Sequence, residues 1–96
     1  MRPEKIVEAL VEAAGAMGIR VRKERGNFRG GLCTVDGEEI IILNLRQPLH
    51  VQLAILAEGL HDRNVEDVFL APAVRSALED AWNNRVEADS GLDDAA

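Results

Sequence analysis

The chain has 96 residues, the length of one small domain, and 47% of them are hydrophobic, as in globular rather than disordered proteins. Its formal net charge of -6 disfavours a nucleic-acid partner, because binding a phosphate backbone requires many cations. No apolar run approaches the roughly 20 residues that a membrane span needs, and no secretory signal is present, so we expect a cytoplasmic protein without a membrane partner. The single cysteine, Cys33, cannot form an internal disulfide, which fits a reducing compartment.

Residues 4–17 predict the first helix. Ile6 and Leu10 belong to an apolar series at helical spacing, and glutamates occupy a different stripe. Pro3 suits the first turn of this helix, where a missing N–H costs nothing. Gly18 suits the left-handed position just past its end. The segment is therefore expected to be amphipathic, with one face in the core.

Residues 18–24, GIRVRKE, predict a half-buried strand, because apolar and charged residues alternate along it. A glycine-containing loop, RGNFRGG, follows. Five basic residues lie in the strand and the loop: Arg20, Arg22, Lys23, Arg25 and Arg29. Two interpretations stay open for this basic cluster: a solvated strand face and turn, or a contact with an anion or a partner. Phe28 is the only aromatic residue among them, and one ring is not a platform for stacking bases.

The clearest element is a hairpin in LCTVDGEEIIILNL, residues 32–45. Asp36-Gly37 is a two-residue turn between two strand-like runs, and pairing through it sets Cys33 opposite Ile40. Residues 40–43 are apolar without alternation, which predicts a strand at the centre of its sheet. We expect Cys33, facing Ile40, to be a packed thiol rather than a nucleophile.

Two helices are predicted after the hairpin. Pro48 opens one and Pro72 opens the other, and Asn64 is expected to cap a short turn between them. The stripe of the first helix that should face the sheet consists of Leu49, Leu53, Leu56 and Leu60. The buried face of the second should consist of Val74, Leu78, either Ala81 or Trp82, and Val86. From residue 87 the sequence is small and acidic, so we expect a single domain at residues 1–86 and a disordered tail at residues 87–96.

These elements predict an α+β fold. The expected order is α-β-β-β-α-α: an N-terminal helix, a small and mostly antiparallel sheet of about three strands, and two C-terminal helices.

The helix segment LAILAEGLHDRN, residues 53–64, is similar to a zinc-protease helix. In such a helix two histidines four residues apart bind the metal, and the glutamate beside the first activates the bound water. This template places Ala57 at the first ligand, Glu58 at the base and His61 at the second ligand, so the first ligand is absent. The acidic residues that could supply a third ligand by position are Glu66, Asp67 and Glu79. The alternative for His61 is a residue near a helix C-terminus, where its protonated form interacts favourably with the helix dipole.

The run IIILN followed by LAILAEGLH, together with the element order, resembles the N-terminal part of the zincin-like domain of bacterial ImmA/IrrE-type metallopeptidases. The resemblance covers residues 4–62 and implies a zincin-like fold. Members of that family act on repressors in phage and stress responses. Because the ligand set is incomplete here, the resemblance implies a degenerate domain, a pseudoenzyme without a bound cofactor. The chain is also similar to short bacterial proteins of unknown function, which imply no activity.

The sequence therefore favours a non-catalytic interaction module that contacts a protein partner or itself. The helix face bearing Ala54 and Ala57 is a candidate for close packing in such a contact. One alternative is a metal-dependent hydrolase with Glu58 as base and His61 as ligand. The other is an anion or nucleic-acid contact through the basic cluster in residues 20–29, which the overall acidity disfavours.

Overall fold

The computed structural model has the element order α-β-β-β-α-α, which confirms the predicted α+β fold. It describes residues 1–61, 63 and 65–95, and for residues 85–95 it describes the backbone alone. The elements are α1 (Pro3–Ala16), β1 (Arg20–Glu24), β2 (Gly31–Val35), β3 (Glu38–Asn44), α2 (Leu49–Leu60), a 3₁₀ helix (Val65–Asp67) and α3 (Pro72–Ala95). None of the helices that the structure describes is both long enough and apolar enough to cross a bilayer.

The end of α1 is fixed by glycine, as predicted. Gly18 has a φ of +83°, in the left-handed region that a residue with a Cβ rarely adopts. The Ile19 N–H donates to the Ala14 carbonyl, and the Gly18 N–H donates to the Gly15 carbonyl. This pair of hydrogen bonds is a Schellman motif, which satisfies carbonyls at the helix end and turns the chain directly into β1.

The sheet is mixed, with strand order β1-β3-β2. The hairpin between β2 and β3 has the predicted register, with Cys33 opposite Ile40. Its turn residues Asp36 and Gly37 have φ values of 52° and 82°, as a two-residue turn with two left-handed positions requires. β1 pairs with the other edge of β3 in parallel, so β3 is the central strand, as its apolar run predicted.

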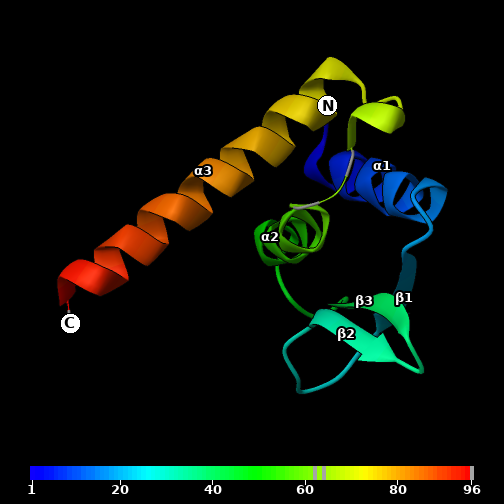
Figure 1. Cartoon of the computed structure of the whole chain (residues 1–96), viewed down its shortest axis with the longest axis horizontal. Helices are drawn as coiled ribbons and strands as arrows, with labels where there is room; N and C mark the ends of the chain where they lie inside the picture. Colours follow the sequence, from blue (N-terminus) through cyan, green and yellow to red (C-terminus); the bar gives the residue numbers. More distant parts are fainter. Residues whose placement is uncertain (62, 64, 96) are drawn as a thin grey trace.

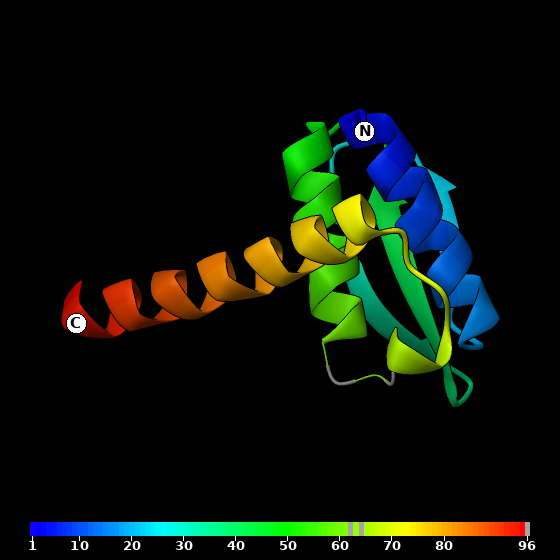
Figure 2. The same cartoon turned by 90° about the horizontal axis from the view of Figure 1, so that it is seen from above.

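The molecule has three layers. α1 and α2 lie side by side on one face of the sheet, and α3 crosses over them on the side away from the strands (Figures 1 and 2). The distal half of α3 extends away from the rest of the molecule (Figure 1). The backbone of residues 87–95 continues α3, so the predicted domain boundary after residue 86 does not coincide with a helix end. Disorder of the 87–96 tail stays a prediction, and the expected cap Asn64 lies outside the described residues.

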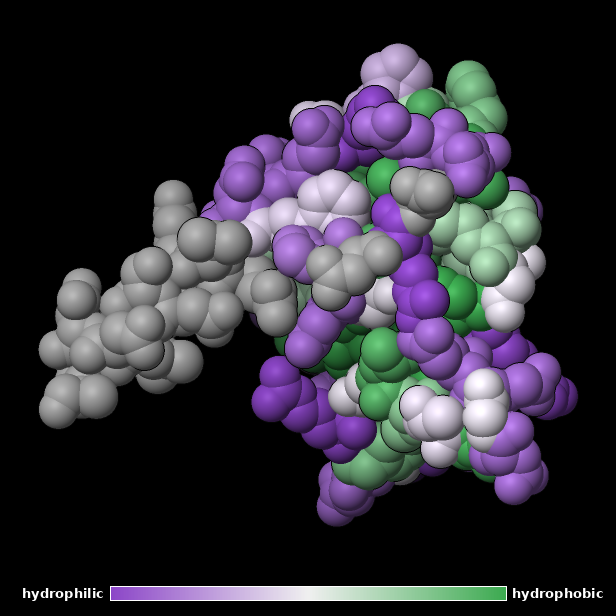
Figure 3. Space-filling model, in the orientation of Figure 1, coloured by the Kyte–Doolittle hydropathy of each residue, from purple (hydrophilic) through white to green (hydrophobic). Residues whose placement is uncertain are grey.

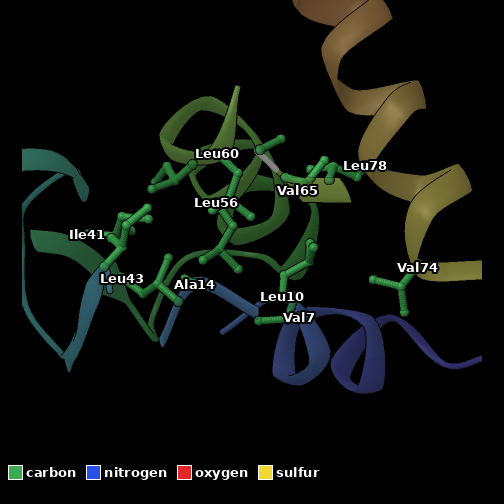
Figure 4. Close-up of a cluster of buried hydrophobic side chains, with 13 residues drawn as sticks. Val7, Leu10, Ala14, Ile41, Leu43, Leu56, Leu60, Val65, Val74 and Leu78 are labelled. Carbon is green, nitrogen blue, oxygen red and sulfur yellow. The ribbon is translucent and has the colours of Figure 1, made fainter. Parts of the chain in front are cut away.

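The core lies between the sheet and the helices and is aliphatic. Figure 4 shows Leu10 of α1, Leu56 and Leu60 of α2 and Ile41 of β3 converging on one another. Leu56 and Leu60 of the predicted α2 stripe are fully buried, whereas Leu49 and Leu53 are half-buried at its margin. On α3, Val74 and Leu78 are buried as predicted, and the side chain of Val86 lies outside the described part.

Gly59 allows α2 to approach the sheet closely. A Cβ at this position would lie 2.6 Å from Cδ1 of the fully buried Ile41. Glycine costs a helix up to about 1 kcal/mol relative to alanine, but here it removes a clash with the central strand. Arg63, which follows α2, forms an ion pair with Glu39 of β3.

Candidate functional site

The two candidate residues of the zinc template lie at the C-terminal end of α2. Glu58 is exposed in the last turn, and His61 is the exposed residue that follows the helix. The His61 N–H donates to the Glu58 carbonyl at 3.3 Å. The imidazole ring lies edge-on to the ring of Trp82 from α3, with the ring centroids 5.6 Å apart and an interplanar angle of 85°. His61 thus takes part in the packing between the two helices.

Ala57, which occupies the first-ligand position of the template, is covered by α3. Only 2% of this residue is exposed. Its carbonyl belongs to the last turn of α2, where helix carbonyls lack partners within the helix, and it accepts a 2.7 Å hydrogen bond from the Trp82 indole N–H. Trp82 thus contacts the helix at both ligand positions of the template. The expected close-packing face at Ala54 and Ala57 is therefore wrong for Ala57, because α3 of the same chain already packs there.

The possible third ligands are not gathered around His61. Glu66 and Glu79 line a small pocket of about 100 Å³ with Trp82 and Arg75, whereas Asp67 lines a different pocket beside Arg63. Among the residues that the structure describes, no group of three histidine, cysteine or acidic side chains could hold a metal ion. What this end of α2 offers is a helix terminus packed on tryptophan.

The basic cluster is exposed but is divided between the two faces of β1. Side chains alternate along a strand, so Arg20 and Arg22 project on one side and Lys23 on the other. Arg22 is paired with Glu24, with 2.5 Å between the guanidinium and the carboxylate. Arg25 and Arg29 are exposed in the loop that follows. The cluster makes β1 a strongly charged edge strand but does not form a single cationic face.

No known relative indicates which of these features carries the function. A scan against protein-family models finds no match, and neither the curated proteins nor the solved structures contain one that is significantly similar to this chain.

The feature that the sequence did not predict is the β2 edge. In the part of the chain that the structure describes, β2 pairs with β3 on one side only, and Leu32, Cys33, Thr34 and Val35 are all exposed along it. Cys33 was expected to be a packed thiol, and that prediction is wrong. It stands opposite Ile40 as expected, but an outer strand has no neighbour on its far side to cover it. Figure 3 shows hydrophobic surface over this part of the sheet, bordered by hydrophilic residues.

The sheet face opposite α1 and α2 adjoins this edge, and we call it the open face. Ile41 and Leu43 point to the helices, so the alternation of side chains places Ile40 and Ile42 of β3 on the open face. The β2 residues opposite them on this face are Cys33 and Gly31, with Val35 beyond. Val35 and Leu32 are about half exposed, at 49% and 46%.

At one end of this surface, the loop between β1 and β2 is held by hydrogen bonds to Asn44. Asn44, 2% exposed at the end of β3, donates from Nδ2 to the Gly26 carbonyl at 2.9 Å and to the Phe28 carbonyl at 2.6 Å. Its Oδ1 accepts the Arg46 N–H at 3.1 Å. Gly30 lies so close to β3 that a Cβ would be 2.2 Å from the Ile42 carbonyl oxygen. Among the glycines of this loop, Gly30 is therefore required by close packing.

Proposed function

We propose that this chain is a non-catalytic interaction module that binds a polypeptide strand along the β2 edge. The observation that carries the proposal is that β2 exposes uncharged side chains along a backbone edge that no other described strand pairs with. A strand edge of this kind is a template for pairing, and proteins that keep their edges unpaired protect them with charges, prolines or bulges.

The two edges of the sheet differ in this respect. β1 exposes Arg20, Arg22 and Lys23, which oppose the approach of another strand. β2 carries no charged residue and no proline between Gly31 and Val35. The contrast within one small sheet indicates that β2 is the edge available to a partner.

The proposal includes the degenerate zincin-like character of the domain. Its support is the order of elements through α2 and the positions of Glu58 and His61, with Ala57 in place of the first ligand. The packing of Trp82 against His61 and Ala57 favours a structural role for this helix end over hydrolysis.

The test is binding that depends on the β2 edge. The full chain, immobilised through its N-terminus, is incubated with cell lysate and, separately, with the purified chain in solution. Wild type is compared with Leu32→Lys, which places a charge on the edge, and with Glu8→Lys on the exposed face of α1 as a control. We expect Leu32→Lys to lose the bound polypeptide and the control to retain it. Equal binding by all three proteins, or no binding to any, would contradict the proposal.

A further inference from the structure

We propose that the polypeptide received by the β2 edge is β2 of a second copy of this chain, paired antiparallel about a two-fold axis at Cys33. This inference rests on the proposed function and specifies its partner. This pairing of two β2 strands would join two three-stranded sheets into one continuous sheet, with the helices of both copies on the same side. Such an isologous contact closes on itself and leaves the charged β1 strands as the outer edges.

The direction of the backbone groups fits this register. In a hairpin with a two-residue turn, the residues flanking the turn bond to each other, and bonded pairs then alternate along the ladder. Val35 and Cys33 therefore bond to β3, while the N–H and C=O groups of Leu32 and Thr34 point away from it. With Cys33 opposite Cys33 of the second copy, Leu32 stands opposite Thr34, and each such pair can exchange two hydrogen bonds.

The side chains along the seam are complementary in size. The same register places Val35 opposite Gly31 of the second copy, on the open face. Val35 is 49% exposed, and the space where a Cβ of Gly31 would lie is empty to 4 Å. The exposed valine thus finds room over the one residue of the strand that has no side chain.

The charges at the ends of the seam are also complementary. Continuing the register one step outward brings Gly30 opposite Asp36, so Arg29 of one copy lies next to Asp36 of the other. Both residues are exposed, and the two-fold axis repeats the pair at the opposite end. Between these ends the seam is uncharged. Pairing β2 with β1 would instead set uncharged residues against Arg20 and Arg22, and it would leave one edge of each kind free to continue into a filament.

The test uses the full chain, with mass measured by light scattering and sedimentation from micromolar to millimolar concentration. We expect a monomer–dimer equilibrium. Thr34→Pro removes the outward N–H at both symmetric positions without removing a bond to β3, and it should weaken dimerisation about tenfold or more. Thr34→Val keeps that N–H and should dimerise like wild type. Leu32→Lys provides a second edge variant, and amide NMR spectra verify that each variant is folded.

The register is tested separately by charge and by cross-linking. Arg29→Gln and Asp36→Asn should each weaken the dimer about two- to fivefold at low salt, and the double variant should be no weaker than either one. A short bismaleimide should link two copies through Cys33, and Thr34→Pro should lose this product. A chain that stays monomeric to millimolar concentration, or a dimer that Thr34→Pro and Leu32→Lys leave intact, would overturn the self-pairing. A monomer that still binds a lysate polypeptide through β2 would overturn only this inference, whereas loss of both kinds of binding would overturn the proposed function as well.

Discussion

At the scale of single residues, the Asn44 side chain at the end of β3 holds the loop between β1 and β2 by hydrogen bonds. Asn44→Ala leaves the Gly26 and Phe28 carbonyls and the Arg46 N–H without their side-chain partner. We expect a loss of about 2–3 kcal/mol in the free energy of unfolding, because partly buried polar groups would lose their hydrogen bonds. Urea denaturation measures this value. Asn27→Ala, at an exposed position in the same loop, is the matched control and should change it by less than about 0.5 kcal/mol. Equal effects of the two substitutions would show that Asn44 does not hold the loop.

An experiment on His61 distinguishes a structural role for the end of α2 from the hydrolase alternative. Because the His61 ring packs on Trp82 and Ala57, at the first-ligand position, is buried, we expect no specific zinc site at this end of α2. The NMR shifts caused by added zinc should therefore not saturate near one equivalent. A catalytic site needs about three protein ligands. The measurement is a zinc titration followed by amide and histidine-ring NMR signals in wild type and His61→Ala. Shifts that saturate at one equivalent, centre on Glu58 and His61, and disappear in the variant would instead support metal binding and justify a hydrolysis assay.

At the scale of elements, substitution of two helical glycines with different surroundings tests how closely α2 packs against the sheet. Gly15→Ala in α1 places a methyl group in open space and should raise the free energy of unfolding by up to about 1 kcal/mol. Gly59→Ala gains the same helix propensity, but its Cβ would lie 2.6 Å and 3.0 Å from side-chain atoms of Ile41. Since Ile41 is fully buried and its surroundings are packed, we expect net destabilisation.

Thermal and urea unfolding of both variants provide the comparison. A stabilised Gly59→Ala protein would mean that Ile41 can adopt another rotamer without loss, and that α2 is not held at a fixed distance from β3.

The elements that the sequence predicted are those set by local chemistry. Pro3, Pro48 and Pro72 coincide with helix starts, and Gly18 coincides with the left-handed position after α1. The Asp36-Gly37 turn determined the hairpin register, because a two-residue loop fixes which residues stand opposite each other. Each of these features depends on the conformational limits of a few neighbouring residues.

What could not be predicted depends on which strand lies beside which. The hairpin alone does not say that β1 joins the far edge of β3, and this order is what leaves Cys33 and Val35 exposed on an outer strand. Likewise, the spacing within α2 placed Ala57 on a helix face but could not show that Trp82, 25 residues later, packs there. The candidate site at β2 exists because of the order of the strands in the sheet. The zinc template describes spacing within one helix, so it carries no information about that order.

At the scale of the whole molecule, the distal part of α3 tests where the folded unit ends. The buried contacts of α3 come from Val74 and Leu78, with Trp82 following, and the helix backbone then extends away from the other layers (Figure 1). A chain ending at residue 86 keeps these contacts. It also loses four acidic residues, Glu87, Asp89, Asp93 and Asp94, whose mutual repulsion opposes the compact state. We therefore expect its free energy of unfolding to lie within about 0.5 kcal/mol of the full chain.

Urea unfolding of the two chains at the same low concentration makes this comparison, and a chain ending at residue 80, which lacks Trp82, is the control. The shorter control should be clearly destabilised, because the Ala57 carbonyl loses the indole N–H and the end of α2 loses its aromatic cover. If removal of residues 87–96 were as damaging as removal of Trp82, the tail would belong to the folded unit and the boundary at residue 86 would be wrong. If the 86-residue chain is as stable as the full one, its dimerisation should also be unchanged, since the β2 edge lies on the sheet and α3 packs on the opposite side of α1 and α2.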